Sequence, residues 1–193
     1  MIKVLYCHGM GGDGLSSYRQ VVKLFADQGI EIISPTINHS YFIDNPYIFE
    51  TMKELAKDVD VVVGNSMGGF FAYHLGKACG KPTLCFNPAI SEITTSYNWF
   101  NKVTNYEPSE DQKKSLILMG TRDTVVDHFA GKRFIDNNGF DTDEIEYMEG
   151  ETHTLAFFAE ENSDFPGILP KIVQFAHENT DIDFDSTEEE LTY

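Results

Sequence analysis

The chain has 193 residues, which suits one compact domain, and its hydrophobic content of 41% excludes a globally disordered chain. Its 31 acidic residues outnumber the 14 basic ones and give a formal net charge of -17. This charge repels phosphate groups, so it disfavours nucleic-acid binding and charge-driven docking on an anionic membrane.

Short apolar runs recur along the chain, and amphipathic segments separate them. The runs of strand length are 2–7, 31–34, 59–63, 82–86, 115–119 and 144–148. The segments with helical spacing are 16–27, 47–57, 67–78, 129–136 and 165–178. Continuously apolar strands that alternate with helices are typical of a parallel sheet covered on both faces. We therefore predict an α/β fold, a three-layer α/β/α sandwich around a mostly parallel sheet of about six strands.

Two segments do not follow this alternation. Residues 91–112 form a long polar and aromatic stretch, which predicts a small lid-like insertion or, alternatively, a surface excursion whose aromatic rings pack down. If it is a lid, its side chains Tyr97, Trp99 and Phe100 are candidates for lining a substrate pocket. Residues 181–193 are rich in acids and predict a frayed tail, which leaves residues 1–180 as the single domain.

The N-terminus and the cysteines indicate a protein of a reducing compartment. No apolar run reaches the roughly 20 residues of a membrane helix, and the first run is too short for a signal peptide. The three cysteines, Cys7, Cys79 and Cys85, lack the spacing of a disulfide framework or a zinc site, so we interpret them as core residues. These observations predict a cytoplasmic protein and indicate no metal or cofactor.

The most informative motif follows the valine-rich run. Residues 64–68 read Gly-Asn-Ser-Met-Gly between a predicted strand and a predicted helix, which is the pattern of a nucleophile elbow. A sharp turn of this kind exposes the hydroxyl of Ser66 above the sheet, and side chains at Gly64 and Gly68 would collide with it. Ser66 is therefore the candidate nucleophile.

A serine nucleophile needs a base and an orienting acid, in the chain order serine, acid, histidine. Asp123 follows the predicted strand 115–119, and Asp127 is a rival acid that we expect to cap the next helix instead. His153 follows the last predicted strand, whereas the other histidines lie in less suitable positions. Because the carboxyl ends of parallel strands share one edge, the sequence predicts a triad of Ser66, Asp123 and His153.

The first predicted strand ends in His8-Gly9-Met10, followed by a glycine-rich run. A turn at this place supplies the second oxyanion donor of such a site, the N–H of Met10 or alternatively of Gly11, beside the N–H of Met67 at a helix N-terminus. The run lacks the GxxxxGK[ST] pattern, so we do not interpret it as a phosphate loop.

Taken together, these motifs resemble the α/β-hydrolase superfamily from Met1 to about Glu178. With Asn87-Pro88-Ala89 and the segment 120–127, they more narrowly resemble the small bacterial YqiA-like esterase family. The resemblance implies an esterase or thioesterase that acts on small acyl esters or thioesters. An acyltransferase or haloperoxidase-like enzyme with the same triad and a non-catalytic binding protein of this fold are the alternatives.

Overall fold

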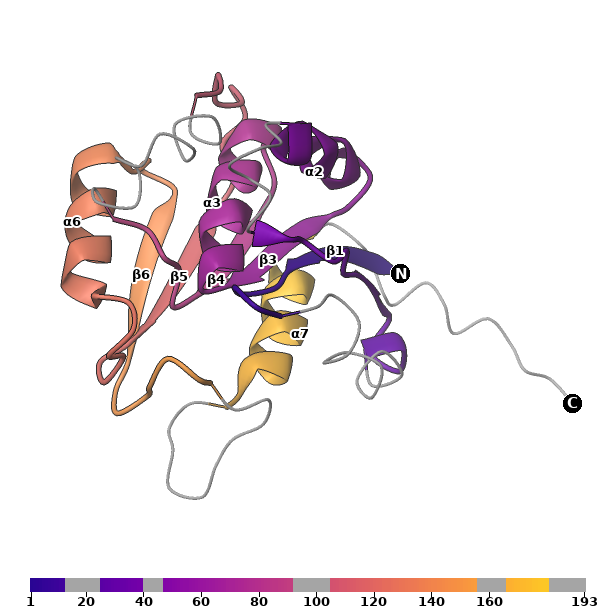
Figure 1. The fold of residues 1–193 in the computed structure, drawn as a ribbon. Helices are drawn as coiled ribbons and strands as arrows, with labels where there is room; N and C mark the ends of the chain where they lie inside the picture. The colour runs from indigo at the N-terminus through magenta and orange to yellow at the C-terminus, as the bar shows by residue number, and fades with distance from the viewer. Residues whose placement is uncertain (13–24, 40–46, 92–104, 156–165, 181–193) are drawn as a thin grey trace, which may run out of the picture.

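Six strands form one parallel sheet at the centre of the computed structural model, which describes residues 1–12, 25–39, 47–91, 105–155 and 166–180 (Figure 1). The strands are β1 (Ile2–Cys7), β2 (Ile30–Ile33), β3 (Val61–Asn65), β4 (Thr83–Phe86), β5 (Ser115–Gly120) and β6 (Asp143–Met148). Their order in the sheet is β2-β1-β3-β4-β5-β6. β2 follows β1 in the chain and lies on one side of it, and β3 lies on the other side. The direction of the strand order therefore reverses there, which places a topological switch point between β1 and β3.

Helices cover both faces of the sheet, as expected. Within the described residues the helices are α2 (Tyr47–Lys57), α3 (Met67–Cys79), α6 (His128–Asn138) and α7 (Ile168–Glu178). α3 lies on one face of the sheet and α7 on the other (Figure 1). Buried residues of α2, α3 and α6 share one hydrophobic cluster with the sheet, and those of α7 share a second cluster with its other face. The molecule is therefore a three-layer α/β/α sandwich, and the predicted fold class is confirmed.

Most element boundaries lie within one or two residues of the prediction, and α2 has the predicted bounds. The largest difference concerns α7, which was predicted from Phe165 but begins at Ile168. Gly167 precedes it with a φ of 97°, a left-handed conformation that cannot continue a helix, so Pro166 lies before the first turn. Most of the predicted helix 16–27 and most of the predicted insertion 91–112 lie outside the described residues, as does the whole predicted tail 181–193, while residues 25 and 26, near the end of that helix, are helical.

Side chains alternate between the two faces of the sheet along each strand. In β3, Val62 belongs to the cluster under α3, while Val61 and Val63 belong to the cluster under α7. The same alternation places Gly64 on the α3 face and Asn65 on the α7 face. This assignment determines what each residue around the elbow can touch.

A buried ion pair connects α3 to the start of β6. Lys77 and Asp143 pair with side chains that are each 1% exposed, and the Tyr73 hydroxyl donates a hydrogen bond of 2.8 Å to Asp143. Burial raises the pKa of Tyr73, so its hydroxyl keeps the proton that it donates. The network joins segments 70 residues apart in the chain, away from the carboxyl ends of the strands.

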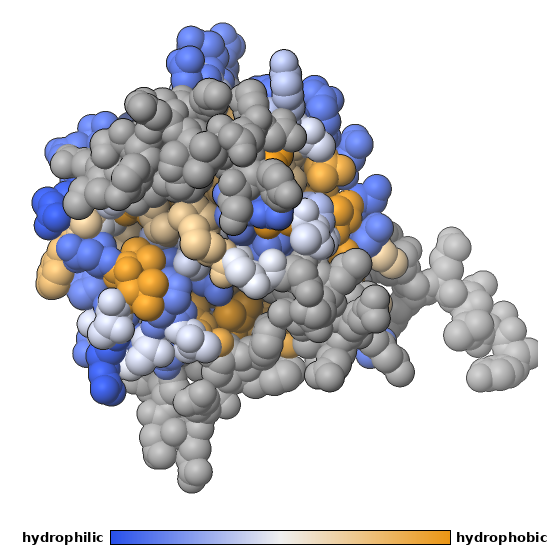
Figure 2. All heavy atoms as spheres, viewed as in Figure 1, coloured by the Kyte–Doolittle hydropathy of each residue, from blue (hydrophilic) through white to orange (hydrophobic). Residues whose placement is uncertain are grey.

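On the face that carries α2, α3 and α6, the described residues form hydrophilic areas with hydrophobic areas between them (Figure 2). Pairs such as Lys53–Glu50 and Lys57–Glu54 line the outer side of α2, where exposed ion pairs contribute little to stability. No helix in the described part of the chain has the length and apolar character that crossing a membrane requires.

Candidate active site

A strained turn joins β3 to α3 at Ser66. The serine has a φ of 56° and a ψ of -121°, a conformation that costs a non-glycine residue about 1–3 kcal/mol. Its backbone is held from both sides, because its N–H donates to the Phe86 carbonyl at 2.9 Å and its carbonyl accepts from Phe70 and Ala89. The strain is therefore fixed by the surrounding structure.

Two glycines make this turn possible. A Cβ at Gly64 would lie 2.2 Å from the Gly68 carbonyl oxygen, and a Cβ at Gly68 would lie 2.0 Å from the Cys7 carbonyl oxygen. Both distances are far inside van der Waals contact with backbone atoms that cannot move aside. The spacing Gly-x-Ser-x-Gly is thus a packing requirement of the elbow.

The structure brings Ser66, His153 and Asp123 into one hydrogen-bonded row. Ser66 Oγ lies 3.0 Å from His153 Nε2, and His153 Nδ1 lies 2.7 Å from Asp123 Oδ2. The Asp123 carboxylate is 1% exposed and the His153 side chain 21%. A carboxylate only accepts hydrogen bonds, so it holds the proton on Nδ1 and leaves Nε2 free to accept from the serine hydroxyl.

Backbone donors hold the Asp123 carboxylate in place. Its Oδ1 accepts from the N–H groups of Val125 at 2.7 Å and Val126 at 2.9 Å, so only Oδ2 faces His153. The rival Asp127 caps α6 and accepts from Phe129 and Ala130, as expected. Of the two candidate acids, Asp123 is the one in contact with the histidine.

Asn87 was not predicted as a site residue, yet it connects the loops that carry the acid and the histidine. Its Oδ1 accepts from the buried Gly120 N–H at 2.7 Å, and its Nδ2 donates to the Thr152 carbonyl at 2.9 Å. One amide thereby joins the ends of β5 and β6. Its φ of 41°, which asparagine tolerates better than most residues, is visible only in the structure, and the sequence offered no more than its position after the predicted strand 82–86.

The predicted oxyanion donors are Met67, at the start of α3, and Met10, in the loop after β1. Met67 is the first residue of α3, where backbone N–H groups lack partners within the helix. A Cβ at Gly9 would lie 3.4 Å from Ser66 Cβ, so the loop after β1 passes close to the nucleophile. Met10, the next residue, is 64% exposed.

Hydrogen bonds fix the orientation of the peptide between Gly9 and Met10. The Gly9 carbonyl accepts from the Gly12 N–H at 3.1 Å and lies 2.8 Å from His8 Nδ1. His8 Nε2 accepts from the Ile37 N–H at 2.7 Å, which keeps the proton of the neutral ring on Nδ1. In a trans peptide the N–H points opposite to the carbonyl, so the Met10 N–H has a fixed direction.

A pocket of about 330 Å³ opens beside the serine and the histidine. Its described lining residues are Tyr6, His8, Gly9, Met10, Gly12, Asn65, Ser66, His153, Thr154, Leu155 and Ile168. None of these residues is a lysine, arginine, aspartate or glutamate. Tyr6, Leu155 and Ile168 are buried members of the cluster under α7 and were not predicted as pocket residues. The predicted acyl-pocket residues Tyr97, Trp99 and Phe100 lie outside the described residues.

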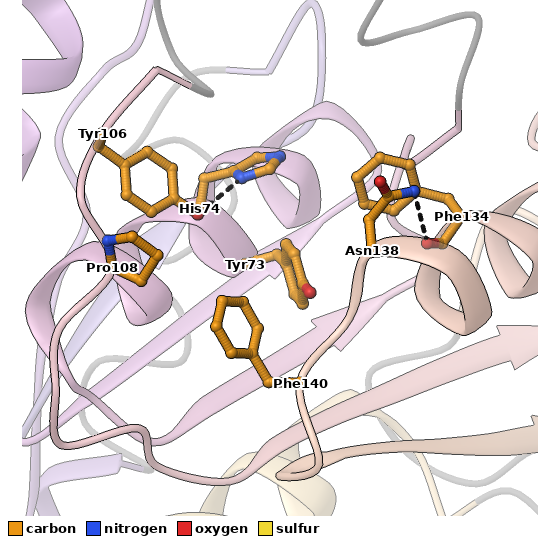
Figure 3. Close-up of a pocket in the computed structure, with 7 residues that line it drawn as sticks. All are labelled: Tyr73, His74, Tyr106, Pro108, Phe134, Asn138 and Phe140. Carbon is orange, nitrogen blue, oxygen red and sulfur yellow. Dashed lines mark hydrogen bonds between the residues drawn. The ribbon is translucent and has the colours of Figure 1, made fainter.

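A second pocket of about 310 Å³ lies along α3 (Figure 3). His74 and Tyr106 face each other there, with 2.9 Å between Nδ1 and the hydroxyl. Burial lowers the pKa of His74 to about 3 and raises the pKa of Tyr106, so both groups stay uncharged near neutral pH. This pair is a neutral structural hydrogen bond, and the pocket at Ser66 is the stronger candidate site.

The sequence is similar to that of one protein family. The uncharacterised protein family UPF0227 matches the chain over residues 3–112. A UPF0227 protein of Vibrio parahaemolyticus is 21% identical over 143 residues, which cover 65% of this chain and 78% of the relative. A UPF0227 protein of Citrobacter koseri is 22% identical over 139 residues, covering 64% and 77%.

Solved structures with this fold include two enzymes. The monoacylglycerol lipase of Paleococcus ferrophilus has a TM-score of 0.64 and 14% identity, and the match covers 92% of this chain and 95% of the lipase. Acyl-protein thioesterase 2 of Zea mays has a TM-score of 0.61 and 17% identity, with 92% and 93% covered. The match to UPF0227 confirms the resemblance to YqiA-like proteins, and at these identities the structural likeness shows the α/β-hydrolase fold alone.

Proposed function

The chain belongs to the uncharacterised protein family UPF0227, and we propose that it is a serine hydrolase that cleaves small acyl esters or thioesters. The row of hydrogen bonds from Ser66 through His153 to Asp123 carries this proposal. Nucleophile, base and orienting acid are the three groups that acyl transfer through serine requires. Strain at Ser66 adds support, since strained backbone is concentrated at functional sites.

In the first half of the reaction, Ser66 Oγ attacks the substrate carbonyl while its proton moves to His153 Nε2. Asp123 stabilises the imidazolium that forms. The carbonyl oxygen becomes an oxyanion and accepts hydrogen bonds from the N–H groups of Met10 and Met67, each of which lowers the barrier by about 3 kcal/mol. His153 then returns the proton to the departing alcohol or thiol, which leaves the acyl group on Ser66.

In the second half, His153 takes a proton from water, and the hydroxide attacks the acyl-enzyme carbonyl. The same two N–H groups stabilise the second oxyanion. Its collapse breaks the bond to Ser66 Oγ, which regains the proton from His153 and releases the carboxylic acid. The enzyme ends in its starting state.

The pocket supports an uncharged acyl substrate of modest size. Its volume of about 330 Å³ is near the lower end of about 300–1,000 Å³ that is usual for small-molecule sites. Tyr6, Leu155 and Ile168 supply apolar wall, and the described lining offers no lysine or arginine to hold an anionic group. The neighbours named as a monoacylglycerol lipase and an acyl-protein thioesterase are consistent with an acyl group as the part recognised.

The test is hydrolysis of p-nitrophenyl acetate and butyrate and of short acyl-CoA thioesters, together with labelling by a fluorophosphonate probe. Ser66→Ala is expected to lower turnover by about 10⁴-fold or more and to abolish labelling, with unchanged circular dichroism. Ser109→Ala is the matched control, because this serine lies outside the pocket and is expected to change neither readout. Full turnover in Ser66→Ala would refute the proposal, and a wild-type protein that is neither labelled nor active would favour a binding protein.

A further inference from the structure

Asn65 lies next to the nucleophile and has an amide oxygen without an internal partner. It is the last residue of β3 and lines the pocket at Ser66. Its Oδ1 is buried and accepts no hydrogen bond. The amide of Asn87, one strand away, bonds at both ends, and of the residues that line the pocket at Ser66 Asn65 is the one with a buried unpaired side-chain oxygen among the described residues.

An orphaned amide oxygen is costly where its surroundings are apolar. Leaving a buried acceptor unpaired costs about 1–3 kcal/mol, and such groups are few in folded proteins. Strand alternation places the Asn65 side chain on the α7 face, where Tyr6, Leu155 and Ile168 supply the pocket wall. A leucine has a similar volume and would avoid the cost. A ligand that supplies the missing partner accounts for asparagine at this position.

The position of Asn65 limits where that partner lies on the substrate. Consecutive Cα atoms are 3.8 Å apart, so the amide reaches only groups within a few bonds of the carbonyl that Ser66 attacks. Asn65 as a residue is partly exposed, and an asparagine amide turns over a broad range about its last torsion. A hydroxyl suits both ends of the amide, because it donates to the oxygen and accepts from the nitrogen.

We propose that Asn65 selects substrates with a hydroxyl group close to the scissile ester, in preference to esters with a hydrocarbon group at the same place. This inference rests on the proposed hydrolase function and narrows its substrate class. When a hydrocarbon substrate occupies the pocket, the Asn65 amide stays unpaired, and this cost disfavours that substrate. Such discrimination is stronger than the discrimination of an apolar wall between two hydrocarbon groups.

The experiment compares two isosteric pairs of esters. Phenyl glycolate against phenyl propionate places the hydroxyl on the acyl side, and 2-hydroxyethyl butyrate against propyl butyrate places it on the alcohol side. The kcat/KM of each ester is divided by its rate of hydrolysis by hydroxide, so that intrinsic reactivity cancels. The wild-type protein is expected to favour the hydroxylated ester by about tenfold in one of the two pairs.

Asn65→Leu is expected to reduce that preference to about one. Asn138→Leu makes the same chemical change on α6, outside the pocket at Ser66, and is expected to keep the wild-type ratio. If Asn65→Leu does not fold, Asn65→Ala is judged by the same ratio.

Two results would overturn the inference. The first is a wild-type protein that cleaves both members of each pair without preference. The second is an Asn65 variant that loses activity on both members by the same factor, which would indicate positioning of the elbow. Either result leaves the hydrolase proposal intact. If the wild-type protein cleaves none of the four esters, or if Ser66→Ala cleaves them as fast as wild type, both proposals are refuted.

Discussion

Asp123→Asn tests the proposed role of the acid with almost no change of shape. In the structure Oδ1 accepts from the N–H groups of Val125 and Val126, and Oδ2 accepts from His153 Nδ1. An asparagine has only one acceptor oxygen, and the two backbone donors require it. Its NH₂ group must then face His153 Nδ1, which has to give up its proton and act as an acceptor.

The consequence is a histidine in the wrong tautomer. With Nδ1 unprotonated, the neutral ring carries its proton on Nε2, and Nε2 can no longer accept the proton of Ser66. The opposite amide orientation is no better, because it presses an NH₂ group against two N–H groups. We therefore expect kcat to fall by about 10⁴-fold, the size seen for this change in a serine protease triad, while the fold is retained.

Asp127→Asn is the control for this experiment. Asp127 caps α6, and asparagine caps helices about as well as aspartate, so we expect wild-type activity and a stability change of a few tenths of a kcal/mol. Both variants are assayed by ester hydrolysis with Ser66→Ala as the blank and by chemical denaturation. An Asp123→Asn protein with activity within tenfold of wild type, or an equal loss in Asp127→Asn, would show that the acid has been wrongly assigned.

Three further outcomes are expected. Asn87→Ala leaves the buried Gly120 N–H unpaired and loosens the loops that carry Asp123 and His153. We therefore expect kcat to fall by about tenfold or more and the free energy of unfolding, measured in urea, to fall by about 1–3 kcal/mol. Unchanged kinetics would contradict this prediction. His74 has a folded-state pKa of about 3 against an ordinary 6.5, so unfolding takes up a proton and stability falls as pH drops below 6.5. The stability of wild type relative to His74→Phe should therefore drop by about 2 kcal/mol from pH 7 to pH 5 in urea titrations, and a constant difference would refute the shift. Lys77→Met leaves Asp143 buried without its cation, so the unfolding free energy should fall by about 3–5 kcal/mol, and a loss under 1 kcal/mol would indicate that water reaches the carboxylate.

The sequence predicted the parts of this protein that depend on neighbouring residues. The elbow is an example, because Gly64 and Gly68 are needed by the same turn that holds Ser66. The helix cap of Asp127 is another, since its partners are two and three residues away. Asp123 and His153 follow different strands, and the structure places them 2.7 Å apart because parallel strands bring their carboxyl ends to one edge.

Features that depend on distant contacts were not predicted. Asn87 bonds to residues 33 and 65 positions away, and no pattern around it announces both partners. The apolar wall of the pocket combines Tyr6 of β1 with Ile168 of α7. These two residues line one pocket because the side chain of Tyr6 lies on the face of the sheet that α7 covers. The start of α7 was misplaced for a different reason. The sequence does not reveal that the backbone of Gly167 has a positive φ, which prevents the helix from beginning before Ile168.

The net charge of the protein bears on which substrates can approach the pocket at Ser66. A formal charge of -17 produces a negative field that weakens the approach of any anion, and this effect extends about 10 Å at 0.1 M salt. The described residues lining the pocket at Ser66 carry no fixed charge that would offset this field locally. A phosphate-bearing acyl carrier would thus meet repulsion on approach without a cation at this wall, whereas a neutral hydroxylated ester meets neither obstacle. The field of the whole chain therefore favours an uncharged substrate, and the orphaned amide of Asn65 narrows that class to uncharged esters with a hydroxyl group.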